Sequence, residues 1–170
     1  MARMSHSSLC LNDIGSVVFS LVLSAFICVA NVQAQSPVIS EIHYNPLDAL
    51  VPSGGTNVVD GGEFESVEVR NMGASPYELN GVSFVSGVSY TFPSYSLAPG
   101  DSVVVVENAA LFTNRYPWVT NVAPGQYGGK LSNGGETLTL EDSLGSPLYS
   151  VSYGDGGAWP KSADGEGRSL

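Results

Sequence analysis

Short apolar runs separated by turn residues are the feature that most limits how this chain can fold. From Pro37 onward, runs rich in Val, Leu, Tyr or Phe alternate with clusters of Gly, Pro, Asn, Asp and Ser. No segment shows a convincing helical period, and short strands at near-regular spacing are typical of antiparallel sandwiches and barrels. The sequence therefore predicts an all-β antiparallel β-sandwich with strands at 38–44, 64–71, 82–86, 90–92, 102–107, 137–141 and 148–153.

Two of these strands differ in how their side chains are distributed. In the strand at 64–71, Val67 and Val69 alternate with Glu68 and Arg70, so one face is expected to be buried and the other wet. The run Val103 to Val106 lacks alternation and is expected to be buried on both faces, which predicts a central strand.

The segments between the strands include one expected helical turn and two long loops. The segment 108–116 begins at a capping residue, Asn108, and ends before Pro117, so a short helix is expected there. Residues 47–62 and 117–129 form the longest irregular stretches, and loops of such length are uncommon unless they are functional or mobile. Residues 131–136 resemble a hairpin turn in which Gly supplies positive φ.

The first thirty-four residues differ in composition from the rest. An early Arg3 precedes a largely apolar stretch from Ile14 to Val32, which closes on a small-residue pattern at Ala34. These features predict a secretory signal peptide over 1–34, with a retained membrane anchor as the alternative. Both cysteines, Cys10 and Cys28, lie in this leader, so the mature chain over 35–170 contains no thiol and no transmembrane span is expected in it.

The charge balance excludes one class of partner. The chain carries 6 basic and 16 acidic residues, a net charge of −10, and removal of the leader with Arg3 and Asp13 leaves this balance unchanged. The five remaining basic residues are scattered, whereas nucleic-acid affinity requires clustered Lys or Arg. We therefore expect no nucleic-acid binding.

Several motifs, in order and spacing, are similar to those of the lamin-tail domain, an immunoglobulin-like module. They are Ile39 to Pro46, Glu63 to Asn71, Tyr77 to Val82, Leu97 to Asp101, Leu131 to Glu136, Leu138 to Leu140, Asp142, Gly145, Trp159-Pro160 and Gly167 to Leu170.

The resemblance implies an immunoglobulin-like β-sandwich over 35–170, and the opening motif resembles the exported bacterial branch. One departure is Val82, which stands where the family often has Trp, so the core must repack there. In related proteins, this domain is usually one module of a larger exported protein. It often stands beside a spore-coat-protein-H-like kinase, nuclease or phosphatase domain. The segment 167–170 resembles the entry into a last strand, which predicts a domain truncated at its C-terminal end; a natural short protein with a frayed end is the alternative.

Acidic residues in and around the first two strands form one candidate site. They could converge if these strands pair, and calcium prefers six to eight oxygen ligands. No EF-hand spacing is present, so a solvated acidic face is the alternative. Three of the glutamates, at 41, 63 and 65, equally fit a glycosidase pair. The candidate calcium ligands are Glu41, Asp48, Asp60, Glu63 and Glu65.

Aromatic residues form the other candidate site. Such rings bind sugars and protein partners, but they also fill sandwich cores. The candidate ligand contacts are Tyr90, Tyr95, Tyr116 and Trp118.

No catalytic site is predicted. His43 is the only histidine of the mature chain, and no Gly-x-Ser-x-Gly motif accompanies it, so a structural role is expected. We therefore expect a non-catalytic, secreted or cell-envelope module that binds a protein or a cell-surface polymer and needs no cofactor. The alternatives are the N-terminal module of a larger secreted enzyme and a calcium-dependent adhesion domain.

Overall fold

The computed structural model describes residues 37–50 and 57–170. The predicted signal peptide lies outside this part of the chain. Within the described residues, no helix is long and apolar enough to cross a membrane.

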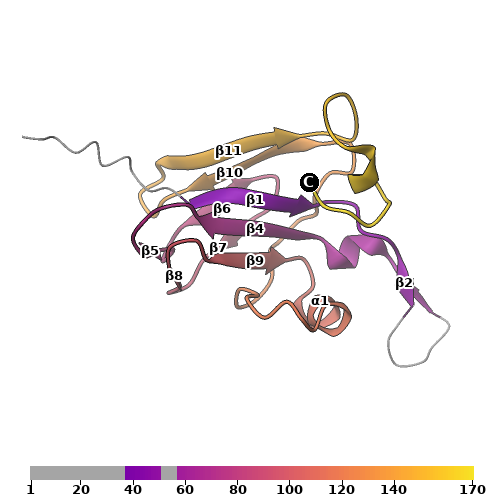
Figure 1. The fold of residues 1–170 in the computed structure, drawn as a ribbon, viewed down its shortest axis with the longest axis horizontal. Helices are drawn as coiled ribbons and strands as arrows, with labels where there is room; N and C mark the ends of the chain where they lie inside the picture. The colour runs from indigo at the N-terminus through magenta and orange to yellow at the C-terminus, as the bar shows by residue number, and fades with distance from the viewer. Residues whose placement is uncertain (1–36, 51–56) are drawn as a thin grey trace, which may run out of the picture. The chain divides into compact units, whose positions relative to one another are not determined.

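Three antiparallel strands form the first sheet, in the order β1-β4-β9. They are β1 (Pro37–His43), β4 (Ser66–Asn71) and β9 (Ser102–Val106), and they lie side by side in Figure 1. The central strand is β4, which pairs with β1 on one edge and with β9 on the other. The strand that contains residues 103–106, β9, is therefore at an edge of this sheet, and the prediction that it is a central strand is wrong.

Four antiparallel strands form the second sheet, in the order β11-β10-β6-β7. They are β6 (Ser83–Ser86), β7 (Tyr90–Thr91), β10 (Glu136–Glu141) and β11 (Pro147–Tyr153). Two short pairs complete the strands: β2 (Ala49–Leu50) with β3 (Val58–Val59), and β5 (Tyr77–Glu78) with β8 (Ser96–Leu97).

The main core is built from the inward faces of both sheets. Alternation along β4 turns Val67 and Val69 inward, and alternation along β10 does the same for Leu138 and Leu140. All four side chains are almost completely buried, and each such aliphatic side chain stabilises the fold by about 1.5–3 kcal/mol. The predicted antiparallel β-sandwich is confirmed.

A bulge in β1 sets which of its side chains enter the core. Ile39 is paired with Val69 and Glu41 with Glu68, so Ser40 is an extra residue without a cross-strand partner. An extra residue reverses the alternation of side chains along a strand. Ile39 and Ile42, three residues apart, are therefore both buried, while Glu41 and His43 lie on the outer face.

One α-helix among the described residues covers the outer face of β9. It is α1 (Ala109–Arg115), and the side chain of Asn108 caps it by accepting a hydrogen bond from Leu111 N at 3.1 Å, as predicted. Phe112 of α1 packs on Val104 and Val106 in a second apolar cluster. This cover explains why β9, an edge strand of its sheet, is buried on both faces.

Two short 3-10 helices and the chain end complete the described fold. They are η1 (Gly61–Phe64), before β4, and η2 (Lys161–Ala163). At the chain end, Leu170 and Ile42 donate a backbone hydrogen bond to each other, at 2.9 and 3.2 Å. The segment after η2 therefore reaches the free edge of β1, where the C-terminal label lies in Figure 1.

A substitution at Gly135 tests the packing of the tight turn that leads into β10. The φ of Gly135 is +96°, and a Cβ there would overlap the Tyr153 carbonyl oxygen and lie 2.6 Å from Gly154 Cα. Gly125 has φ +85° but open space around its Cα. We expect Gly125→Ala to cost about 1–2 kcal/mol of unfolding free energy, from backbone strain alone. Gly135→Ala should cost at least about 3 kcal/mol, measured by urea unfolding, and equal losses would contradict this packing.

Candidate functional site

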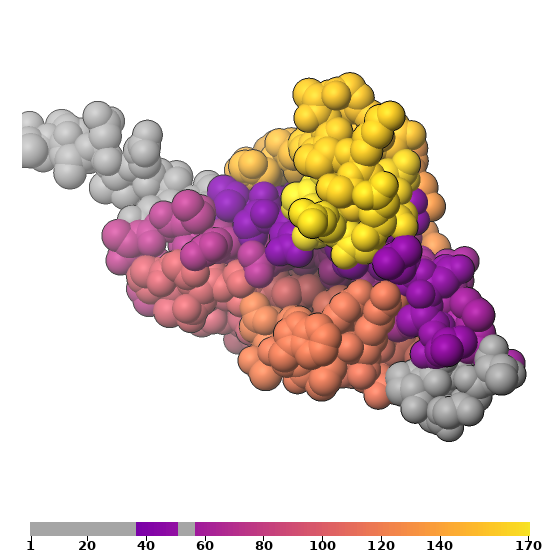
Figure 2. All heavy atoms as spheres, turned by 45° about the vertical axis from the view of Figure 1, so that its right-hand side comes forward, coloured from indigo at the N-terminus to yellow at the C-terminus, as the bar shows by residue number. Residues whose placement is uncertain are grey.

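A groove of about 740 Å³ lies on the outer face of the first sheet. Its floor is formed by β1, β4 and β9, and its two walls are formed by the segment from α1 to residue 121 and by residues 167–169. Figure 2 shows the C-terminal segment in yellow and the α1 region in orange on either side of a narrow indigo and purple strip. Because both walls are separated in sequence from the floor, the groove exists only in the folded domain.

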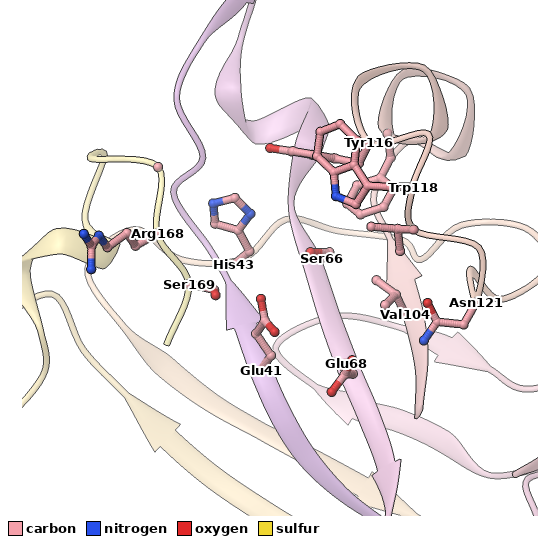
Figure 3. A pocket seen from close by; sticks show the side chains of 13 residues that line it. Glu41, His43, Ser66, Glu68, Val104, Tyr116, Trp118, Asn121, Arg168 and Ser169 are labelled. Atoms are coloured by element: carbon pink, nitrogen blue, oxygen red, sulfur yellow. The ribbon is translucent and has the colours of Figure 1, made fainter. Parts of the chain in front are cut away.

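The floor is set by the register between β1 and β4. Glu41 lies opposite Glu68, and His43 lies opposite Ser66. These four side chains share the outer face and line the groove, as Figure 3 shows. The two glutamates are direct cross-strand neighbours, and like charges in this arrangement destabilise a sheet.

Hydroxyl groups hold Glu68 in place. Ser40 donates a hydrogen bond to Glu68 Oε1 and Ser102 donates one to Oε2, both at 2.7 Å. Asn121 Nδ2 in turn donates to Ser102 Oγ at 3.1 Å and to the Ser102 carbonyl at 2.9 Å. Glu68 is therefore a fixed carboxylate. Its donors are neutral, so its charge is not cancelled.

Aromatic residues form the wall beside α1. Tyr116 and Trp118 pack edge to face, with ring centroids 5.7 Å apart and planes at 80°. Tyr116 also packs against Phe112, at 4.9 Å, which anchors it to α1. The side chain of Trp118 is 72% exposed. An indole with this exposure at a groove wall can contact a ligand without rearrangement.

Arg115, at the end of α1, is committed to the scaffold. Its Nη1 donates a hydrogen bond to the Leu47 carbonyl at 2.6 Å. Its guanidinium lies over the Phe64 ring, at 4.2 Å, and near the Tyr116 ring, at 5.2 Å.

His43 lies half-buried on the floor of the groove. Burial, together with the nearby positive charge of Arg115, lowers the pKa of His43 to about 4. Its Nε2 atom is buried and has no hydrogen-bond partner within the described part of the chain. Ser66 lies opposite His43 on β4, and no hydrogen bond joins it to the Nε2 atom in the described part of the chain.

The candidate calcium ligands do not gather at the groove. Glu41 lines it, whereas Asp48, Asp60 and Glu65 line a second, smaller cavity of about 350 Å³. Asp48 accepts a hydrogen bond from Gly61 N, and Asp60 accepts one from Gly62 N, both at 2.8 Å. Both aspartates therefore fix the backbone at η1.

Glu63 belongs to a charged cluster around Lys130. Lys130 Nζ lies 3.3 Å from Glu63 Oε1 and 3.5 Å from Glu107 Oε1. Asn108 donates to the other Glu63 oxygen at 3.0 Å, and this hydrogen bond is the main cause that lowers the pKa of Glu63. The cluster joins η1 to the start of α1.

Glu65 is the one buried carboxylate of the candidate set. Its side chain is 2% exposed, and its Oε2 accepts hydrogen bonds from Leu131 N, at 2.8 Å, and from the Tyr127 hydroxyl, at 3.0 Å. Burial raises the pKa of Glu65 to about 6, against the opposing effect of these hydrogen bonds. Glu65 is therefore a structural link between η1 and the segment 127–131.

Over residues 37–50 and 57–170, no group of three or more His, Cys, Asp or Glu side chains is arranged to hold a metal ion. The calcium site stays a prediction, and the function proposed below does not depend on it.

The four candidate aromatic residues fall into two pairs. Tyr116 and Trp118 form the groove wall. Tyr90 is buried in the main core and donates a hydrogen bond to the Pro124 carbonyl at 2.8 Å. Tyr95 is half-buried and packs against the same core. The structure therefore brings only Tyr116 and Trp118 to the groove.

Sequence reasoning did not select Ser66, Glu68, Asn121 and Arg168 as site residues. The alternation in β4 was a signal for Glu68, since it assigned this residue to the wet face. No local pattern indicated the register of β4 with β1. For residues 167–169, the signal was the resemblance of segment 167–170 to the entry into a last strand.

A family comparison identifies the fold. The lamin tail domain family model matches residues 31–155, well over half of the chain. This chain belongs to the lamin tail domain family. The predicted immunoglobulin-like fold and the predicted family are thus confirmed. The lamin tail domain is a non-catalytic, binding-type module, and a comparison with curated proteins finds no match to this chain.

Glu65 gives this lamin tail domain a defined pH dependence. The pKa of Glu65 in the folded state, about 6, is above the ordinary value of 4.5. The contribution of Glu65 to the free energy of unfolding is therefore complete below pH 4.5 and is lost as the pH rises through 6. The difference in unfolding free energy between the parent and Glu65→Gln should therefore fall by about 2 kcal/mol from pH 4.5 to 7. Urea unfolding across this range measures it, with Glu78→Gln as the control for lost charge. A difference that is constant with pH would contradict the shift.

Proposed function

We propose that this lamin tail domain is a non-catalytic extracellular module that attaches a larger exported protein to a protein or a polymer of the cell surface, and that the groove is its contact surface. The observation that carries the proposal is the exposed indole of Trp118 beside Tyr116 in the wall of the groove. Large exposed aromatic side chains next to polar groups are enriched where proteins bind partners.

The extracellular part of the proposal is supported by composition. The sequence has an apolar leader over 1–34, and both of its cysteines lie there. A net charge of −10 favours solubility in a salty exterior and disfavours nucleic acid.

Export predicts a defined mature N-terminus. When the full chain is expressed with its leader, the secreted product should begin at Gln35, as N-terminal sequencing of that product will determine. A product that retains residues 1–34 in the membrane fraction would contradict secretion and favour an anchored chain.

Attachment through the groove predicts a strong effect of one side chain. Trp118→Ala should reduce binding of the secreted protein to surface preparations of the source cells by about tenfold or more, because exposed aromatic anchors carry much of a binding energy. Leu144→Ala removes another exposed apolar side chain, 89% exposed, at the turn between β10 and β11, and should bind as the parent does. Equal binding of Trp118→Ala and the parent would overturn the proposal.

A further inference from the structure

The glutamate pair on the groove floor lacks a neutralising partner. Within the part of the chain that the structure describes, the salt bridges shorter than 4.0 Å are those of Lys130 with Glu63 and Glu107. Glu41 and Glu68 therefore face each other without a cation of the protein between them. Two adjacent carboxylates repel each other, and a bound cation would relieve this repulsion.

Within the described residues, the positive groups near the floor form no ion pair with Glu41 or Glu68. Arg115 donates to the Leu47 carbonyl and stacks on Phe64. Figure 3 shows the guanidinium of Arg168 directed away from Glu41. His43 has a pKa of about 4, so it is uncharged near neutral pH. The floor therefore keeps its negative charge, in a chain whose net charge is already −10.

The lining next to this charge is apolar and aromatic. Val104, Phe112 and Val119 line the same groove, and Trp118 stands at its wall. Lysine and arginine bury their aliphatic stems on apolar surface while the charged head stays near polar groups, and an indole face attracts such a head. An amino sugar has the charge but no aliphatic stem to pack on these residues.

We propose that the groove binds an extended basic peptide, with a lysine or arginine side chain laid along Val104 and Val119 and its charged head between Glu41 and Glu68, beside Trp118. This inference rests on the proposed function, because it names the partner chemistry of the same groove. Charge complementarity gives the interaction specificity and a dependence on salt.

The test uses the secreted protein and a dye-labelled peptide of alternating Gly and Lys residues, with binding followed by fluorescence anisotropy. Glu41→Gln and Glu68→Gln should each weaken binding by about fivefold or more at low salt, and the loss should shrink as salt is raised. Trp118→Ala should weaken binding by about fivefold at all salt concentrations. A peptide with Glu in place of Lys should not bind.

Glu78→Gln is the matched control for Glu68→Gln. Glu78 is an exposed glutamate of β5 that also accepts a serine hydroxyl, from Ser96 at 2.6 Å, so Glu78→Gln removes the same charge from a carboxylate in a similar setting. It should bind the lysine peptide within twofold of the parent. A loss equal to that of Glu68→Gln would mean that the whole acidic surface attracts the peptide, and would overturn the proposal.

Ser66→Lys provides a variant that keeps both glutamates. Position 66 lies on β4 two residues before Glu68, on the same outer face. The ammonium group of the introduced lysine can therefore occupy the place proposed for the charged head of the peptide side chain. This variant should weaken lysine-peptide binding by about fivefold or more. Unchanged binding would overturn the proposal even if Glu68→Gln proved unstable.

A neutral chitin oligosaccharide separates this inference from the proposed function. If the oligosaccharide binds, needs Trp118 and is indifferent to Glu41→Gln and Glu68→Gln, while the lysine peptide does not bind, the basic-peptide inference is wrong and attachment through the groove stands. If Trp118→Ala leaves cell-surface binding unchanged, the proposed function itself fails.

Discussion

The bulge at Ser40 is the constraint on which both faces of the first sheet depend. Side chains alternate along a strand, so Ile39 and Ile42 cannot both enter the core unless one residue between them is extra. Ser40 is that residue, and both isoleucines are buried. The same shift places Glu41 and His43 outward, opposite Glu68 and Ser66. One inserted residue thus completes the core and builds the groove floor, and the Ser40 hydroxyl fixes Glu68 from beside it.

The groove also depends on the fact that α1 covers only one edge of the outer face of the first sheet. On β9, the outer face is apolar, and α1 packs on Val104 and Val106 through Phe112. On β1 and β4, the outer face is polar and stays open between α1 and residues 167–169. Because the apolar part of the sheet anchors α1, the following segment carries Tyr116 and Trp118 to the boundary between the covered and open parts. The position of the aromatic wall therefore follows from the two valines of β9 that face α1, Val104 and Val106.

Much of the fold could be predicted because its signals are local. Strands β1, β4 and β9 begin and end within two residues of the predicted ranges, and Asn108 caps α1 as expected. The strand order, the short pairs β2–β3 and β5–β8, and the bulge depend on contacts distant in sequence, which no local pattern encodes. The site could be predicted only in part because it combines local and distant signals. Alternation along the strand assigned Glu68 to the wet face, but only the register between β1 and β4 places it opposite Glu41.

Hydrogen-bond donors separate two kinds of carboxylate that are indistinguishable in the sequence. Asp48, Asp60 and Glu65 accept backbone N–H groups, and these interactions hold η1 and its neighbours in place. Carboxylates that accept backbone N–H groups in this way stabilise a fold by fixing the backbone around them. Glu68 instead accepts neutral hydroxyls on an open face, and Glu41 lies beside it at the surface. The first group shapes the scaffold, and the second keeps a charge that a partner can use.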